Sequence, residues 1–486
     1  MKKRILMALS VLMVLLQSCG HQEDYNPLAP QDEQREVLSK DQLDQVIFDI
    51  LKDTKAFKWN DLNDDQLASA FLLSDKVVTV AWEYNAKTDA AKEAIVALIN
   101  QYENASGDKT DIILSVDDEL NFLDAKIEKV ETLLALRHMK ETVALDVYYE
   151  MFSEEALANS LKPAADLRQN PEDEPSERIP ATLDVATNHN IPDAWAAGLT
   201  GKGIKIAVVD GGLLKDDEVF GNNGNADGDN PFARSVQKKG YYKRKWWNPF
   251  ASFDGPYARS SGLSADHGTR MLKIVGGPSG PKTGVAFNAD LVSVRSANFV
   301  YLDLLRNVRG VTRAFNYLGG QSDVKVISMS QGGLINWTSI TRAIRKCYDR
   351  DKMIFCAGGT FFFAPILTTI VAGSPANITL FPARLGMVHS VTGIRKAYNL
   401  EHAYWCPDCF GAADFVAEFD EGGASSEATA NTAGMAALIW SREPNLSRAE
   451  VLEKIKAASD EPVTKHPYFG YGRINLKTYL DNEGIQ

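Results

Sequence analysis

Short runs of β-branched and apolar residues alternate with helical periodicity in the C-terminal part of the chain. The apolar runs lie at 204–209, 291–295, 324–328 and 387–392, and the helical stretches at 267–275, 302–317, 338–349 and 426–440. Strands that are apolar throughout and separated by helices are typical of a parallel sheet with helices on both faces. We therefore expect an α/β fold over residues 183–486.

Residues 36–163 have a different pattern, rich in Leu, Ala, Asp, Glu and Lys. Helical periodicity is present at 41–56, 87–103 and 117–135, and strands are expected at 77–83 and 142–149. This predicts a mainly helical or α+β N-terminal region. The charged, proline-containing stretch 164–182 that follows predicts an exposed linker, where a cut in the chain is tolerated.

The first residues have the pattern of an export signal. Lys2, Lys3 and Arg4 precede an apolar run from Ile5 to Leu16, which is too short for a stable membrane span. The ending Leu16-Gln-Ser-Cys19 resembles a bacterial lipobox, which implies a signal peptide over 1–18, lipidation of Cys19 and a tether over 19–35. An ordinary signal peptide with a chance cysteine is the alternative. Lipidation implies an exported protein anchored to a bacterial membrane, periplasmic or on the cell surface.

Composition agrees with an exported globular protein. The chain has 486 residues, is 45% hydrophobic and carries a formal net charge of −12. This length is ample for a large core and a second region. The acidic balance argues against nucleic acid as a partner, and the sequence leaves the oligomeric state open.

Three segments supply an acid, a base and a nucleophile. Asp210 ends the apolar strand Ile206–Asp210, His267 opens a helix in Asp266-His-Gly-Thr269, and Ser426 lies in the small-residue run Gly423–Gly434. A serine hydroxyl needs a histidine to remove its proton and a buried carboxylate to orient that histidine. Each segment alone has a plainer explanation, namely a strand end, a helix-opening histidine and an N-cap.

The order Asp210, His267, Ser426 and the flanking motifs resemble the subtilisin-like serine protease (subtilase) family. Gly284–Val294 is similar to "GVAPNAxLxxVKV", Val326–Gly333 to "VINMSLGG" and Gly470–Leu476 to "GxGRVNAxxAL", so that the resemblance covers residues 183–483. It implies an endopeptidase that cleaves polypeptides through an acyl-enzyme and needs no cofactor. It also implies that Ser330, Gln331 and Gly332 pair with an extended substrate, and that the N-terminal region is a prodomain in a zymogen. A helical spacer or a partner-binding domain is the alternative for that region.

One departure from the family concerns the oxyanion site. The family carries an asparagine in "AAGNxG", and Gly359 stands at its place in Phe355–Thr360. Either backbone donors together with a group such as Thr360 suffice, or the local alignment is shifted, or the enzyme is degenerate. A non-catalytic peptide-binding lipoprotein and an acyl transferase that uses the same triad are the alternative functions.

A metal site is also a candidate. Asn223, Asn225, Asp227 and Asp229 place oxygen atoms at every second position, as in the first half of a calcium loop. Arg234 stands where an EF-hand has its glutamate. We therefore expect either a structural calcium site or a plain Asx-rich turn.

Overall fold

A computed structural model describes most of the chain outside its N-terminus and several internal segments. The described residues are 37–86, 89–103, 112–152, 188–217, 219–220, 236–243, 254–258, 266–277, 283–359, 379–394, 412–419, 424–461, 463–467 and 469–485. The predicted signal peptide and Cys19, the linker, the calcium loop 223–229 and Thr360 lie outside them. Over the described ranges, no helix is both long enough and apolar enough to cross a membrane.

The C-terminal part is built on a seven-stranded sheet in which every pair of neighbours is parallel. The strand order is β11-β10-β9-β8-β5-β7-β6. The strands are β5 (Lys205–Asp210), β6 (Gln237–Gly240), β7 (Asp290–Arg295), β8 (Val324–Met329), β9 (Met353–Ala357), β10 (His389–Ile394) and β11 (Phe415–Glu418). The predicted α/β class is confirmed, and the four predicted strands are β5, β7, β8 and β10.

Helices cover both faces of this sheet, because successive side chains of a strand point to opposite faces. Ile206 and Val208 of β5 pack in the core that holds α9 (His267–Gly276) and α13 (Ala424–Arg442). Ala207 and Val209 face the core formed with α10 (Leu305–Gly320) and α11 (Thr338–Asp349). Three further helices are α8 (Ile191–Ala196), which precedes β5, and α14 (Arg448–Ala457) and α15 (Leu476–Asn482), which follow α13.

The N-terminal region is α+β, with an antiparallel sheet of order β2-β3-β1-β4. Its strands are β1 (Val77–Ala81), β2 (Ile113–Asp117), β3 (Phe122–Lys126) and β4 (Ala144–Val147). Its helices are α2 (Lys40–Thr54), η1 (Trp59–Asp61), α3 (Asp64–Leu72), α4 (Ala90–Glu103) and α5 (Val130–His138).

The predicted helix over 117–135 is wrong. Strand β2 ends at Asp117, β3 follows after a turn at 118–121, and the helix α5 begins at Val130. The reason is tertiary: Phe122 to Ala125 are buried between β1 and β2, and this pairing overrides the helical tendency of the Leu- and Lys-rich stretch.

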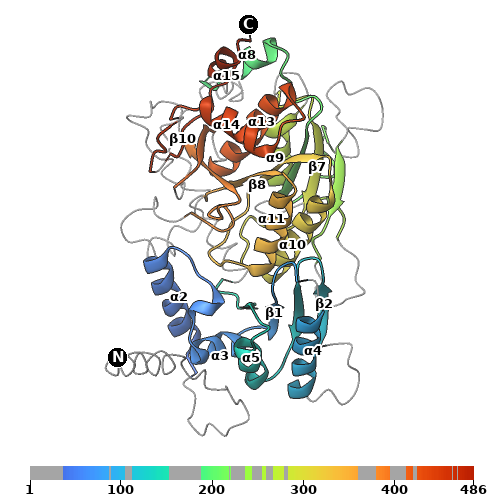
Figure 1. Cartoon of the computed structure of the whole chain (residues 1–486), viewed down its shortest axis with the longest axis vertical. Coiled ribbons are helices and arrows are strands. Elements are labelled where there is room, and N and C mark those ends of the chain that lie inside the picture. The colour runs from blue at the N-terminus through green and yellow to red at the C-terminus, as the bar shows by residue number, and fades with distance from the viewer. Residues whose placement is uncertain are drawn as a thin grey trace, which may run out of the picture.

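The N-terminal sheet lies against α10 and α11, on the side of the parallel sheet away from α9 and α13 (Figure 1). One continuous hydrophobic core includes both the N-terminal region and this face of the parallel sheet. Trp337, which precedes α11, stacks on Tyr148 with ring centroids 5.0 Å apart and also contacts Trp59. The two regions are therefore packed as one body.

Polar residues cross the middle of this contact. Thr79 in β1 pairs in register with Asp124 in β3 and Asp146 in β4, so that the three form a row across otherwise apolar strands. The carboxylate of Asp124 lies 3.0 Å from the guanidinium of Arg309 in α10. Asp146 accepts hydrogen bonds from the Thr338 backbone N–H (2.8 Å) and hydroxyl (2.9 Å), at the first residue of α11.

Candidate active site

Asp210 is the last residue of β5, at the carboxyl end of the parallel sheet, where such sheets place their ligand sites. The apolar residues before it bury the strand, and Asp210 itself is only 2% exposed. The Gly211 backbone N–H donates to the Asp210 carboxylate at 2.6 Å, and the Ser296 N–H donates to the Asp210 carbonyl at 2.9 Å. These bonds fix the acid on a rigid strand end.

His267 is the first residue of α9 and is buried against Asp210. Its Nδ1 lies 3.0 Å from both carboxylate oxygens of Asp210. Helix α9 can begin here because Gly268 has no side chain: a Cβ on it would lie 2.4 Å from the Gly212 carbonyl oxygen. The Asp210 carboxylate therefore holds the Nδ1 edge of the imidazole, and Nε2 remains for another proton partner.

Ser426 lies in the first turn of α13, a helix that packs against α9, which begins at His267. It is 6% exposed, and the Ser330 hydroxyl donates to its backbone carbonyl at 3.3 Å. Among the described residues no hydrogen bond joins Ser426 to His267. Contacts of this kind are often long in unliganded enzymes and tighten only when substrate binds.

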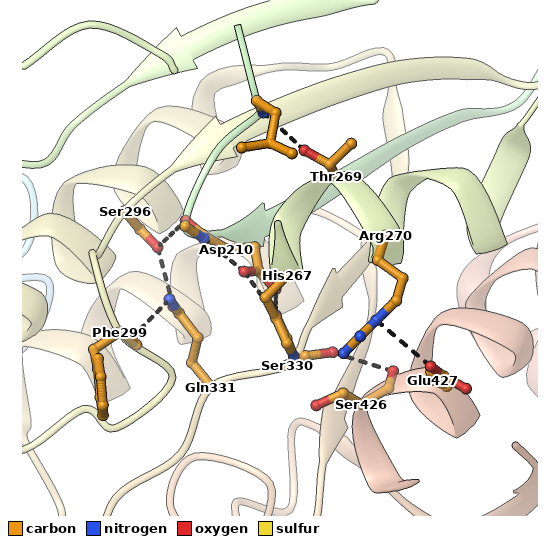
Figure 2. Close-up of polar contacts among 12 residues, drawn as sticks. Asp210, His267, Thr269, Arg270, Ser296, Phe299, Ser330, Gln331, Ser426 and Glu427 are labelled. Atoms are coloured by element: carbon orange, nitrogen blue, oxygen red, sulfur yellow. Dashed lines mark hydrogen bonds and ion pairs between the residues drawn. The ribbon is translucent and has the colours of Figure 1, made fainter. Parts of the chain in front are cut away.

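An ion pair at the site was missed in the sequence. Arg270, one turn after His267 in α9, places Nε 3.5 Å from Oε1 of Glu427, the residue after Ser426 (Figure 2). The Glu427 side chain is 5% exposed and that of Arg270 40%. Only the fold brings these two residues together. The single signal in the sequence was a charged residue within one helical turn of His267 and another next to Ser426.

The predicted substrate-binding residues lie directly after β8. The Gln331 side chain turns inward, where its oxygen accepts a hydrogen bond from the Ser296 hydroxyl at 3.0 Å and its Nε2 donates to the Phe299 carbonyl at 3.4 Å. Through Ser296 it supports the main chain of Asp210. Gln331 thus supports Asp210, the predicted catalytic acid, from behind.

Gly332 already has backbone partners. Its N–H donates to the Val300 carbonyl at 3.0 Å, and its carbonyl accepts from the Leu302 N–H at 2.9 Å. The adjacent Gly333 exchanges two hydrogen bonds with Phe381. In this structure both backbone groups of Gly332 are therefore occupied by the segment 300–302, which must move before a peptide can pair with them.

Gly359 follows the end of β9, where the predicted oxyanion residue belongs. Its φ of +131° lies in the range that favours glycine, and the residue is buried. The preceding Gly358 is fixed by a bond from its N–H to Val391 and another from the Leu380 N–H to its carbonyl. The position therefore offers no side-chain donor, and backbone geometry favours the glycine that is found there.

The predicted calcium ligands at 223–229 lie outside the described residues, so the structure says nothing of them. Within the described part of the chain, no group of three or more His, Cys, Asp or Glu side chains is arranged to hold a metal ion.

Comparisons with known proteins agree with the motifs. Residues 201–403 match the subtilase family (Peptidase_S8). The minor extracellular protease Epr of Bacillus subtilis (strain 168) is 23% identical over 301 residues. The match covers 59% of this chain and 40% of the length of that protein.

Solved structures of MycP1 are also similar. MycP1 from the ESX-1 type VII secretion system is 18% identical with a TM-score of 0.45, over 63% of this chain and 88% of that one. MycP1 with its N-terminal propeptide removed is 20% identical with a TM-score of 0.43, over 61% and 97%. The match of residues 201–403 shows that the chain contains a domain of the subtilase family.

Proposed function

We propose that the protein is a secreted, lipid-anchored serine endopeptidase that cleaves polypeptides through an acyl-enzyme. The observation that carries the proposal is the buried Asp210–His267 contact, in which Nδ1 lies 3.0 Å from both carboxylate oxygens. The helix of His267 packs against the helix whose first turn holds Ser426. This arrangement suits acyl transfer because the carboxylate orients the imidazole and leaves Nε2 free to act as the base for a serine hydroxyl.

In the proposed reaction, Nε2 of His267 takes the proton of the Ser426 hydroxyl as the oxygen attacks the peptide carbonyl. The protonated imidazole then gives this proton to the leaving amine, and the acyl group stays on Ser426 as an ester. A water molecule repeats the sequence and releases the acid and the free serine. Asp210 remains ionised throughout, holds the tautomer and stabilises the imidazolium.

The oxyanion needs hydrogen-bond donors, and the side chain that usually supplies one is absent at Gly359. The first N–H groups of α13 have no partner within the helix and lie at the positive end of its dipole. We propose that the Ser426 backbone N–H is the main donor. The loss of the side-chain donor costs about 10²- to 10³-fold in turnover in subtilisin itself, so a slower enzyme is expected.

The N-terminal region is proposed to be a prodomain. Its sheet buries the row Asp124, Thr79 and Asp146 on α10 and α11, and Arg342 of α11 donates to carbonyl groups of Trp82, Leu120 and Asn121. After β4 the chain runs toward the segment that pairs with Gly332, where Phe152 contacts Tyr301 with ring centroids 5.9 Å apart. We propose that a prodomain at this place controls access to the backbone groups of Gly332.

The remaining parts of the proposal rest on the sequence. The lipobox-like ending at Cys19 supports a lipid anchor on a bacterial membrane, and the Asx-rich stretch 223–229 supports a structural calcium ion. Mass spectrometry of the protein from membranes tests the lipid anchor, since a diacylated Cys19 adds a characteristic mass. Calorimetry with added calcium tests the ion.

A second candidate function is peptide binding without catalysis, which the missing donor at Gly359 favours. Casein hydrolysis by the full chain distinguishes the two, measured before and after an immobilised protease has cut within 164–182 and been removed. We expect hydrolysis that increases after the cut and is absent in Ser426→Ala. A folded parent that binds peptides with no hydrolysis in either form would favour the binding function.

A further inference from the structure

We propose that Arg270 and Glu427 are a positioning pair, which neutralises a buried carboxylate beside the nucleophile and sets the charge around His267 and Ser426. The inference rests on the proposed function and deepens it. It assigns a role to two charged residues outside the proposed set of Asp210, His267 and Ser426.

The pair links the helix of the base to the helix of the nucleophile. Arg270 lies three residues after His267, so that the two side chains share one face of α9. Glu427 directly follows Ser426 in α13. The 3.5 Å contact between Arg270 Nε and Glu427 Oε1 therefore spans the two helices at the site (Figure 2).

Burial strengthens the electrostatic effect of the Glu427 carboxylate on its neighbours. Its side chain is 5% exposed, and a carboxylate taken out of water needs a cationic or hydrogen-bonding partner. The Nε atom of Arg270 is itself buried and makes no hydrogen bond within the described residues, so its contact with Glu427 is a charge contact. In a site of low dielectric, such a charge acts strongly on groups a few ångströms away.

The reaction should respond to an increase in negative charge at this place. Negative charge develops on the substrate carbonyl as Ser426 attacks it, and a Glu427 carboxylate without the Arg270 cation would repel that charge. Because the chain has no side-chain donor at Gly359 to offset this repulsion, neutralisation by Arg270 is especially important here. The effect is specific to the transition state and should appear in kcat more than in KM.

The pair should also shift the pH dependence of the rate at which Ser426 reacts. The charged groups on the elements around His267 are Asp210 from β5, which contacts it, Arg270 from its own helix and Glu427 from α13. Arg295 of β7, which pairs with Asp254, lies behind the Gly212 turn. Removal of the Arg270 cation leaves more negative charge near the imidazole and favours imidazolium; removal of the Glu427 anion does the opposite.

The test uses the full chain and the rate of fluorophosphonate labelling of Ser426 between pH 5 and 9. Arg270→Met should slow labelling about 10- to 100-fold and move the acid limb of the profile to higher pH. Glu427→Gln should move that limb to lower pH. The double variant should return it close to the parent, and Arg270→Lys should recover most of the rate.

Lys273→Met is the matched control. Lys273 is one turn further along α9 and forms its own ion pair with Asp217 at 2.6 Å, so its removal also deletes an ion pair of α9 but leaves the contact of Arg270 with Glu427 in place. Its labelling profile should follow the parent. Thermal unfolding of every variant shows which are folded.

The outcomes separate the two proposals. A parent that does not label refutes the serine protease, whatever the variants do. A parent that labels, together with folded Arg270→Met and Glu427→Gln variants whose acid limbs stay in place or move in the same direction, overturns the positioning pair and leaves the protease intact.

Discussion

The imidazole of His267 and the carboxylate of Asp210 form a bifurcated contact, in which Nδ1 lies 3.0 Å from each of the two oxygens. The acid ends a buried strand and the base begins a helix, so both are held by regular secondary structure. A contact of this kind fixes the tautomer that leaves Nε2 free to accept a proton.

Asp210→Asn tests that relationship. An asparagine at this site can donate to Nδ1, which favours the wrong tautomer and removes the charge that stabilises imidazolium. We expect turnover to fall about 10⁴-fold while the fold is kept. Steady-state kinetics with circular dichroism measure both effects. If the folded variant kept a tenth or more of the parent turnover, Asp210 would not have the proposed role.

Docking of the N-terminal region should weaken as pH rises. Burial raises the pKa of Asp146 to about 7, although hydrogen bonds from Thr338 and the charge of Arg342 act in the opposite direction. The docked state therefore holds a proton that the free region releases near its ordinary pKa. Between about pH 4 and 7 the affinity should fall by up to tenfold per pH unit and then level off.

Size-exclusion chromatography of the chain after a cut within 164–182 measures this, as the fraction of the N-terminal region that stays bound from pH 5 to 8. Asp146→Asn keeps an oxygen that can accept from the Thr338 N–H, and it cannot titrate. The variant should show a flatter pH dependence than the parent. Equal slopes for the two proteins would show that another group controls the release.

The contact of Gly268 with Gly212 should tolerate no side chain. A Cβ at Gly268 would lie 2.4 Å from the Gly212 carbonyl, which must shift the start of α9 and with it His267. We expect Gly268→Ala to lower the free energy of unfolding by about 1–3 kcal/mol and to reduce activity. Urea unfolding measures the first effect. Gly386→Ala is the control, since nothing lies within 4 Å of the place that its methyl group would take, and it should leave both quantities unchanged.

The pairing of Gly332 with residues 300–302 predicts that small and large substrates respond differently to the N-terminal region. A fluorophosphonate needs the activated Ser426 but no pairing with Gly332, whereas an extended peptide needs the backbone groups that Val300 and Leu302 occupy. Release of the N-terminal region, which removes the contact of Phe152 with Tyr301, should raise peptide hydrolysis more than labelling. The ratio of the two rates before and after the cut measures this. A constant ratio would contradict a closed peptide site.

Much of the fold was readable from the sequence. Strand β5 and helix α11 were predicted almost to their ends, because an apolar run before an acid and a regular amphipathic stretch carry their own signals. Strand β6 was not predicted, because its residues Gln237–Gly240 are polar and form the edge of the sheet. Strand β3 was mistaken for helix, because its pairing partners β1 and β2 decide its state.

The site was predictable only where a motif is local. Asp210, His267 and Ser426 were predicted from their neighbours in sequence, and the structure brings the first two into contact. The ion pair between Arg270 and Glu427 joins two distant helices, so no local pattern announces it. The same holds for the polar row of Thr79, Asp124 and Asp146, which becomes visible only when the register of the strands is known.

The most direct test of the central claim is fluorophosphonate labelling of the full chain, read by intact mass, with Ser426→Ala as the control. The account predicts one added phosphonyl group on the parent and none on the variant, with faster labelling of the parent than of Asp210→Asn. A folded parent that stays unlabelled, before and after a cut within 164–182, would contradict the account.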